Sequence, residues 1–384
     1  MGLVAGEASG DALGARLIEA LRREAPVLRC YGIAGPKMEA AGCEAWYRSE
    51  ELSVLGLAEV LPHLRRLFAI RADAVRRLVA ARPDVFVGVD AKEFNLSLAR
   101  RLHRAGLTTV QYVSPQVWAW RQGRVRRMHE AVDLVLCLLP FEKRFYDECG
   151  MRAEFVGHPM ADAIPLAPDR AAARRGLGID VDAQLVALLP GSRRGEISRL
   201  TADMAAVARS IRAVRPEIRF IAPMAGVDAR ALFDSLWGRL APDIDIQVAE
   251  GAAQPALIAC NAALVASGTA TLEAALCKRP MVVIYRLGAL TEWMIRHLHL
   301  IKSPFFAQPN LLAGRQVVGE YFGSDIDPDR IAGELLSWLD DGPRRIRLEE
   351  TFLDIHRQLR RDASLRAAQA IMDLLRAKHE GETP

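Results

Sequence analysis

The sequence lacks the patterns that usually identify a metal site, a disulfide framework or a membrane span. Its 384 residues hold six cysteines without a C-x-x-C pair and eight histidines without an H-x-x-x-H spacing. No apolar run approaches the roughly 18 residues that cross a bilayer, and the first residues show no signal peptide. These absences predict buried, reduced thiols, no metal ion, no cofactor and a cytoplasmic location.

Two familiar phosphate-binding signatures are also absent, and the net charge is small. There is neither a Walker loop nor a G-x-G-x-x-G dinucleotide fingerprint. The 51 basic and 47 acidic residues give a net charge of only +4, which argues against nucleic acid as a partner. Arginines nevertheless gather at residues 65–77 and 121–127. Such clusters suit phosphates or an anionic membrane surface, and solvated helix faces are the plainer alternative.

The sequence does contain a regular alternation of short apolar runs with helical periodicity. The runs lie at residues 3–5, 30–33, 85–89, 109–113, 134–138, 185–189, 219–222, 244–248, 262–266 and 281–285. Strands that are apolar throughout and alternate with helices indicate parallel sheets covered on both faces. The predicted fold class is α/β, with two doubly wound Rossmann-like domains and a cleft between them.

The chain divides into three predicted segments. Residues 1–163 are predicted to form an N-terminal α/β domain and residues 164–345 a C-terminal one, with a hinge near Pro165 and Pro168. Residues 346–384 have the periodicity of charged amphipathic helices and contain no strand. These helices are expected to pack back on the N-terminal domain or on a partner chain.

Two glycine-containing loops stand out in the second half. Residues 188–196 (L-L-P-G-S-R-R-G-E) and 266–273 (A-S-G-T-A-T-L-E) each follow a predicted buried strand and open a helix. Free backbone N–H groups at such junctions face an anion at the positive end of a helix. Two junctions together suggest a nucleotide diphosphate, with Glu273 placed to accept hydrogen bonds from a ribose diol. For either loop alone, ordinary turn chemistry and solvated arginines are the alternative.

The first half carries carboxylates at two strand ends. Residues 4–11 (V-A-G-E-A-S-G-D) are one position away from the G-x-S-x-G of a serine nucleophile, so Ser9 is not assigned that role. Asp11 is either a helix N-cap or a substrate contact. Asp90 follows an apolar strand, where a carboxylate facing a cleft acts as a general base; the alternative is that Asp90 caps the next helix.

Two further segments mix apolar residues with arginine. Residues 114–121 (S-P-Q-V-W-A-W-R) hold two tryptophans and an arginine, which suits a hydrophobic wall near a sugar or acyl group, or a packed aromatic loop. Residues 52–78 interleave leucines with arginines. That pattern is typical of a core helix and equally of a basic amphipathic face that rests on a membrane.

Several of these motifs together resemble the bacterial lipid-A-disaccharide synthases. The resemblance rests on residues 4–11, 113–121 (V-S-P-Q-V-W-A-W-R), 155–159 (F-V-G-H-P), 188–193, 266–273 and the P-N pair at 309–310. It runs in order from residue 4 to about residue 320, and it implies a GT-B glycosyltransferase of lipopolysaccharide synthesis in a Gram-negative bacterium.

The resemblance also implies a reaction. 2,3-Diacylglucosamine would move from UDP to the 6-hydroxyl of 2,3-diacylglucosamine 1-phosphate, which yields the β-1,6 lipid A disaccharide 1-phosphate and UDP. Two alternatives from other classes remain: a UDP-sugar 2-epimerase on the same scaffold, and a non-catalytic protein that binds a UDP-sugar or a lipid.

The residues and the resemblance together assign roles to individual side chains. Asp90 is the expected general base, because a single inverting displacement needs a base behind the acceptor hydroxyl. The C-terminal domain would bind the UDP-sugar through Ser192, Arg193, Arg194, Ser267, Gly268, Thr269, Glu273 and Asn310. The N-terminal domain would bind the acceptor through Glu7, Ser9, Asp11 and Asn95. No metal is expected, because arginines and helix termini balance the diphosphate charge.

The lipid substrates imply contact with a membrane. Because acyl chains cannot stay in water, the N-terminal domain is expected to bind peripherally to the cytoplasmic face of the inner membrane. The expected membrane-facing residues are Leu64, Arg65, Arg66, Leu67 and Phe68. The sequence leaves a homodimer open.

The sequence departs from the family pattern in two places. Lys92 and Glu93 stand where the pattern similar to G-I-D-A-P-D-F-N has Pro-Asp, which keeps Asp90 and Asn95 but puts any role of the second carboxylate in doubt. The chain also begins almost at its first motif, which predicts a natural start a few residues upstream.

Overall fold

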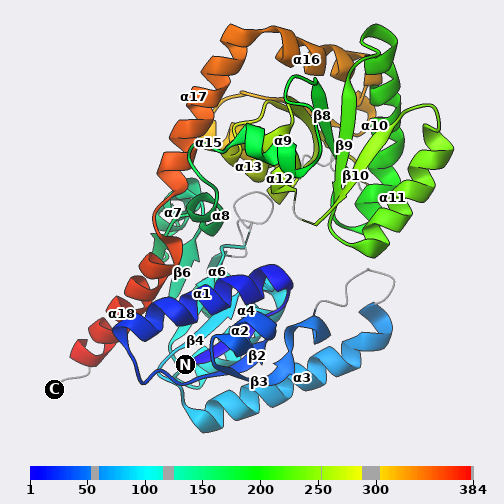
Figure 1. Ribbon diagram of the computed structural model, residues 1–384. Coiled ribbons are helices and arrows are strands. Elements are labelled where there is room, and N and C mark those ends of the chain that lie inside the picture. Colours follow the sequence, from blue (N-terminus) through cyan, green and yellow to red (C-terminus); the bar gives the residue numbers. More distant parts are fainter. Residues whose placement is uncertain (53–59, 116–124, 252, 288–302, 382–384) are drawn as a thin grey trace. The chain divides into compact units, whose positions relative to one another are not determined.

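The computed structural model describes residues 1–381 apart from 53–59, 116–124, 252 and 288–302; the side chains of residues 60–64 also lie outside the described part. The chain forms two compact units (Figure 1). Unit 1 comprises Met1–Asp162 together with Leu359–Pro384, and unit 2 comprises Ala163–Gln358. Among the described helices, none is long and apolar enough to cross a membrane.

Unit 1 is built on a seven-stranded parallel sheet with the strand order β3-β2-β1-β4-β5-β6-β7. Its strands are β1 (Gly2–Ala5), β2 (Cys30–Ala34), β3 (Cys43–Arg48), β4 (Phe86–Val89), β5 (Thr109–Tyr112), β6 (Leu134–Cys137) and β7 (Ala153–Phe155). Its helices are α1 (Ala8–Glu24), α2 (Pro36–Ala40), α3 (Val60–Ala81), α4 (Lys92–Arg104), α6 (Val125–His129), α7 (Pro140–Glu148) and α18 (Ala363–Gly381). The short helix α8 (Pro159–Ala163) lies at the end of the first of its two segments.

Alternation along the strands gives this sheet a core on each face. Leu3 of β1 and Val87 of β4 pack with α1, α2 and α18, whereas Val4 and Phe86 pack with α3 and α4. Successive side chains of a strand point to opposite faces, so a run that is apolar throughout serves both cores. The last helix, α18, thus completes the core that begins with α1 (Figure 1).

Unit 2 has a six-stranded parallel sheet with the order β10-β9-β8-β11-β12-β13. Its strands are β8 (Leu185–Leu189), β9 (Arg219–Met224), β10 (Ile246–Glu250), β11 (Ala262–Ala266), β12 (Met281–Tyr285) and β13 (Gly319–Phe322). Its helices are α9 (Arg170–Gly176), α10 (Arg194–Val214), α11 (Val227–Leu240), α12 (Gln254–Ala259), α13 (Thr269–Leu276), α15 (Gln308–Ala313), α16 (Pro328–Asp340) and α17 (Gly342–Leu359).

The F-V-G-H-P motif lies where the C-terminal segment joins unit 1. Gly157 has a φ of 96°, and a Cβ on it would lie 2.8 Å from the Leu359 carbonyl oxygen. The His158 N–H donates to that same carbonyl at 2.9 Å. Burial lowers the pKa of His158 to about 4, so its neutral ring accepts the Met160 N–H at Nδ1. The motif therefore has a structural use, which its sequence alone did not reveal.

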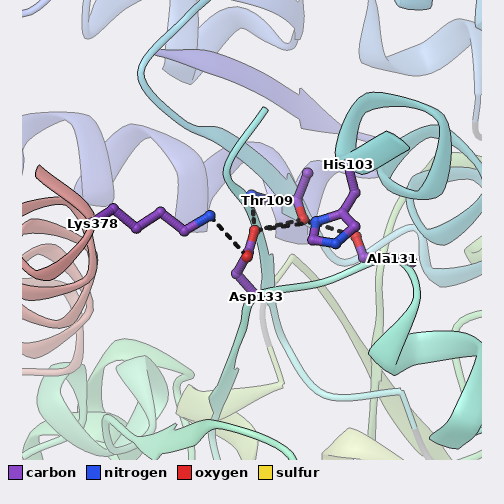
Figure 2. Close-up of polar contacts among 5 residues, drawn as sticks. All are labelled: His103, Thr109, Ala131, Asp133 and Lys378. Atoms are coloured by element: carbon purple, nitrogen blue, oxygen red, sulfur yellow. Dashed lines mark hydrogen bonds and ion pairs between the residues drawn. The ribbon is translucent and has the colours of Figure 1, made fainter. Parts of the chain in front are cut away.

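Two aspartates fasten α18 to this unit. The Asp162 carboxylate accepts the backbone N–H groups of residues 361–363 at 2.7–3.0 Å and so caps the helix. Asp133 accepts from Lys378 of α18 at 2.9 Å and from the Thr109 N–H at 2.7 Å, while His103 Nδ1 lies 3.4 Å away (Figure 2). Burial acts to raise the pKa of Asp133, but the bonds from Lys378 and Thr109 outweigh it, and the pKa lies below its ordinary value.

Candidate active site

The strand order reverses once in each sheet, between β1 and β4 in unit 1 and between β8 and β11 in unit 2. In open α/β sheets, ligands bind beyond the carboxyl ends of the strands at such switch points. The strands β1 and β4 lead into residues 6–11 and 90–95, and β8 and β11 lead into residues 190–196 and 267–273. These four predicted loops therefore lie at switch points.

Asp90 lies in a strained turn directly after β4. Its φ is 51° and that of Ala91 is 37°, in the left-handed region that side-chain-bearing residues rarely adopt. The N-cap residue of α4 is Ala91, and within the described chain the Asp90 carboxylate makes no hydrogen bond or ion pair. Asp90 therefore does not cap α4. Its half-buried carboxylate is free to meet a ligand.

Asn95 holds this turn from inside the sheet. Its Nδ2 donates to the carbonyl oxygens of Asp90 at 3.0 Å, Val4 at 3.2 Å and Val89 at 3.3 Å. The side chain is fully buried, so it offers no surface to an acceptor. The prediction that Asn95 contacts the acceptor is corrected to a structural role: it ties the ends of β1 and β4 together.

Asp11 is also used internally. Its carboxylate is 3% exposed and accepts the N–H groups of Gly35 at 3.0 Å, Lys37 at 2.9 Å and Met38 at 2.9 Å. It therefore caps α2 from outside, and it does not cap its own helix α1, which begins at Ala8. Asp11 thus acts as a cap of a neighbouring helix, and both of its carboxylate oxygens already accept hydrogen bonds.

The remaining residues of this first loop stay accessible. Glu7 is the N-cap residue of α1, and both Glu7 and Ser9 are exposed. A Cβ on Gly6 would lie 2.5 Å from the Ala91 Cβ, so only glycine lets the loop approach the Asp90 turn this closely. The glycine of the motif thus brings Glu7 and Ser9 next to Asp90.

The loop after β8 presents cations at the start of α10. Ser192, Arg193 and Arg194 are exposed, and neither arginine forms an ion pair within the described chain. Gly191 has a φ of 103°, and a Cβ there would collide with the Glu196 carboxylate. The first N–H groups of α10 have no partner within the helix, and the dipole favours an anion there. The predicted phosphate contact of this loop would use these groups.

The loop after β11 has a matching geometry. Gly268 has a φ of 146°, and a Cβ on it would meet nothing within 4 Å, so open space adjoins its backbone. The Ser267 N–H donates to the Ile284 carbonyl and is used by the sheet. Among the described contacts, the N–H groups of Gly268 and Thr269 have no acceptor. These two groups, rather than Ser267 N–H, are the donors that an anion would meet.

Glu273 lies in α13, one turn into the helix after this loop. Its carboxylate makes no hydrogen bond with the described residues, and burial raises its pKa above the ordinary value of 4.5. A carboxylate that is desolvated without a partner costs stability in the unliganded protein. A ribose diol would supply the missing donors.

This carboxylate predicts opposite effects on stability and on binding. Glu273 binds its proton more tightly in the folded than in the unfolded chain, so above the raised pKa its charge destabilises the fold. Glu273→Gln should raise the melting temperature of the unliganded protein at neutral pH and weaken UDP binding about tenfold. Calorimetry and thermal melts check both, with the exposed Glu217→Gln as control. A variant that melts lower and binds UDP normally would contradict this assignment.

Asn310 is buried and fully engaged. Its Nδ2 donates to the Val318 carbonyl at 3.0 Å and to Glu320 at 2.7 Å, while its Oδ1 accepts the N–H groups of Val317 at 2.7 Å and Val318 at 3.0 Å. An amide side chain has no further capacity beyond these four bonds. The prediction that Asn310 contacts the nucleotide is corrected: Asn310 shapes residues 317–320 instead.

Two features of the site escaped the sequence interpretation. Tyr285, Phe306 and Phe322 form a half-exposed aromatic cluster, with ring centroids 5.8–6.4 Å apart, at the carboxyl ends of β12 and β13. Gln111 of β5 donates to the Asp90 carbonyl at 3.1 Å. Single aromatic or amide residues in apolar runs carry no recognisable spacing, so pattern analysis passes over them. Of the predicted tryptophan segment, residues 114–121, the part from 116 to 121 lies outside the described residues.

The membrane prediction falls on α3, whose two faces differ. Arg65 and Arg66 are exposed, and Phe68 is 53% exposed on the outer face. Leu67 is half-buried and packs on the core with Ile70, so its assignment as membrane-facing is corrected. Leu64 belongs to the same helix, but its side chain lies outside the described part.

Comparisons with known proteins decide which family this geometry belongs to. The model of the Lipid-A-disaccharide synthetase family matches residues 1–373. The chain belongs to this family. The lipid-A-disaccharide synthase of Serratia proteamaculans (strain 568) is 48% identical over 377 residues, which cover 98% of each chain. The family recognised from the motifs is confirmed, and with it the glycosyltransferase class.

Solved structures confirm the predicted α/β fold class. A putative UDP-N-acetylglucosamine 2-epimerase from Listeria monocytogenes superposes with a TM-score of 0.64 at 14% identity, covering 99% of this chain and 96% of that one. A calicheamicin glycosyltransferase superposes with a TM-score of 0.51 at 15% identity, covering 100% and 99%. At these identities the likeness shows the shared fold alone. The family match favours the synthase over the epimerase.

Proposed function

We propose that this chain transfers 2,3-diacylglucosamine from UDP to the 6-hydroxyl of 2,3-diacylglucosamine 1-phosphate with inversion, releasing UDP. The observation that carries the proposal is the free Asp90 carboxylate at the unit 1 switch point, in a chain of the lipid-A-disaccharide synthetase family. Unit 2 brings the complementary chemistry, with cations and free N–H groups at its own switch point.

The donor is proposed to bind to unit 2. The diphosphate lies against the N-termini of α10 and α13, with Arg193 and Arg194 as counter-charges and the ribose on Glu273. Negative charge grows on the leaving UDP during the transfer. Donors already aimed at that charge stabilise the transition state more than the ground state. Ser192 and Thr269 add hydroxyl groups beside the phosphates.

The acceptor is proposed to bind to unit 1. Asp90 takes the proton of the 6-hydroxyl as its oxygen attacks the anomeric carbon from the face opposite UDP. Exposed Glu7 and Ser9 hold the acceptor sugar next to this turn. Asp11 and Asn95 act indirectly, because they fix the backbone from which Glu7 and Asp90 project.

The outer face of α3 is proposed as the membrane contact, with the chain bound peripherally to the cytoplasmic face of the inner membrane. Phe68 offers an apolar anchor, and Arg71 lies over its ring at 4.9 Å. Arg65 and Arg76 are exposed on the same face as Phe68. An apolar anchor flanked by cations suits an interface with anionic lipids.

A direct assay tests the activity. Purified protein with UDP-2,3-diacylglucosamine and the acceptor 1-phosphate in detergent should yield a β-1,6 disaccharide 1-phosphate and one UDP per disaccharide. An epimerase would convert the donor without consuming the acceptor. A binding protein would retain UDP and form no product, and either result would refute the proposed transfer.

Arg193 should matter for both binding and turnover. Arg193→Ala removes a charge-assisted contact worth roughly 1.5–3 kcal/mol; because Arg193 is exposed, we expect the low end, about a tenfold loss of UDP affinity. The turnover number should fall as well, since the lost charge faces the leaving group. Titration calorimetry and initial rates measure the two effects, with exposed Arg175→Ala as control. Unchanged affinity and turnover would exclude Arg193 from the site.

A further inference from the structure

We propose that Gln111 is a positioning residue for the transfer, because it fixes the turn from which Asp90 projects. The inference rests on the proposed role of Asp90 as the base. Gln111 is the third residue of β5 and is 1% exposed, so it cannot itself touch a substrate. Its effect on the reaction must pass through the backbone that it binds.

The contacts of Gln111 converge on the ends of two neighbouring strands. Its Nε2 lies 3.1 Å from the Asp90 carbonyl oxygen, 3.3 Å from that of Tyr112 and 3.3 Å from that of Val113. Asp90 N–H in turn donates to the Tyr112 carbonyl at 2.9 Å. One side-chain amide thus links the last residues of β5 to the residue that carries the proposed base.

Asn95 completes a two-sided clamp on the same atom. Its Nδ2 donates to the Asp90 carbonyl at 3.0 Å, so two buried side-chain amides bind one carbonyl oxygen. In the sheet, Gly88 pairs in register with Gln111 and with Val4. A Cβ on Gly88 would lie 2.8 Å from the Asn95 Cβ. Glycine at this position therefore lets Asn95 lie directly over the sheet beside Gln111.

This clamp explains how an unfavourable turn persists. Asp90, Ala91 and Val113 all have left-handed φ values, of 51°, 37° and 77°. Such conformations persist in side-chain-bearing residues only where surrounding contacts over-determine them. With the Asp90 carbonyl held from two sides, the direction of the carboxylate is set by the sheet. Without Gln111 the turn can relax toward ordinary backbone angles. The Asp90 carboxylate would then point in a different direction.

If only the stability of the fold mattered, the buried Gln111 side chain would be unfavourable. Its Oε1 is buried without a hydrogen-bond partner in the described structure, as is the Oδ1 of Asn95. A buried acceptor without a donor is unfavourable, so an apolar residue of similar length would remove that penalty. Two of the three carbonyls that Gln111 binds keep another donor, from Asn95 and from Asp90 N–H. The fold should therefore tolerate the loss of the amide.

Gln111→Met tests the proposal. We expect the turnover number to fall about tenfold or more, because small misplacements of a reacting group are costly. KM for the donor and the Kd for UDP, which binds to unit 2, should stay within about twofold. Thr109→Val in the same strand is the control: it removes the hydroxyl bonds to Ala131 and Asp133 (Figure 2), at the end of β5 opposite the turn. It should lower the melting temperature and leave turnover unchanged.

A double variant separates positioning from mere structure. If Gln111 acts through Asp90, then Gln111→Met should cause no further loss in an Asp90→Asn background. Additive losses would overturn the proposal, as would normal turnover in Gln111→Met while Asp90→Asn is inactive. Normal turnover in Asp90→Asn would instead refute the base assignment, and this inference with it.

A second substitution guards against a variant that fails to fold. Gln111→Glu keeps the size of the side chain but, when ionised, turns an acceptor toward three carbonyl oxygens. Its turnover relative to the unaltered protein should be low at alkaline pH and recover as the pH falls, because a protonated carboxyl donates again. A constant ratio across pH would contradict a role through the Asp90 carbonyl.

Discussion

Asp90→Asn is expected to lower the turnover number at least about a hundredfold, which is the low end of the effect of removing a general base. The substitution keeps the shape of the side chain and removes its ability to accept the proton of the acceptor hydroxyl. UDP affinity should stay unchanged, because the proposed nucleotide contacts all lie in unit 2. Steady-state rates of UDP release and calorimetry with UDP measure the two quantities.

The strand that precedes Asp90 also offers a matched control. Asp84 is exposed and precedes the same strand β4 at its opposite end. Asp84→Asn makes the identical chemical change and should leave both turnover and UDP affinity as they were. Near-normal turnover in Asp90→Asn would remove this residue from the mechanism, and equal losses in both variants would indicate a general effect on unit 1.

Most of the strands could be predicted, because a strand buried in a parallel sheet is apolar along its whole length and so appears in the sequence as a continuous apolar run. The runs ending at Val89, Leu189 and Ala266 each coincide with an observed strand end. Strands β3, β7 and β13 were missed, because charged residues such as Glu44, Glu154 and Glu320 interrupt them. The strand predicted at 244–248 begins at Ile246, two residues later. Edge strands bury only part of their surface, so their sequences carry a weaker signal.

Side-chain roles were harder to predict than loop positions. Asp11, Asn95 and Asn310 are polar residues in the first turns of α1, α4 and α15, and the sequence assigns each of them to a ligand. In the structure their hydrogen bonds go to the protein instead. Asp11 caps α2, Asn95 links the ends of β1 and β4, and Asn310 binds the backbone of residues 317 and 318 and the Glu320 carboxylate. A polar group at a functional loop either meets a ligand or holds the loop. Spacing in the sequence is the same in both cases, and burial alone separates them.

Helix α3 shows the same limit for apolar residues. Leu67, Ile70, Ala74 and Leu78 recur at the helical spacing that faces a core, and they pack on one. Phe68 falls outside that series and is 53% exposed. Leu67 and Phe68 are adjacent, yet one packs on the core and the other is exposed. A prediction that treats residues 64–68 as one membrane-facing segment does not distinguish them. The docking test must accordingly leave Leu67 intact.

The outer face of α3 gives the last prediction. Arg65→Glu, Phe68→Ser and Arg76→Glu, made together, should reduce partitioning to anionic phospholipid vesicles at least about a hundredfold. Each basic residue near such a surface contributes about 1 kcal/mol, and burying a phenylalanine contributes about 1.5–3 kcal/mol. Phe68 is 53% exposed, so only about half of its burial remains to be gained, but each Arg→Glu change both removes a cation and adds an anion. The combined loss therefore exceeds the roughly 2.8 kcal/mol that a hundredfold change requires. Vesicle co-sedimentation measures the partitioning. High salt should weaken wild-type binding only in part, because the apolar contribution is not screened.

A matched triple variant separates this face from bulk charge. Arg23→Glu, Val27→Ser and Arg144→Glu make the same two charge reversals and replace one exposed apolar residue by serine at other positions of unit 1, and Val27 is 88% exposed. This control should bind vesicles nearly as well as the unaltered chain. The α3 variant should also fold and bind UDP normally, since its three side chains lie on the outer face. Equal losses in both triple variants would mean that net charge alone drives adsorption. Undiminished vesicle binding by the α3 variant would move the membrane contact to another part of the chain.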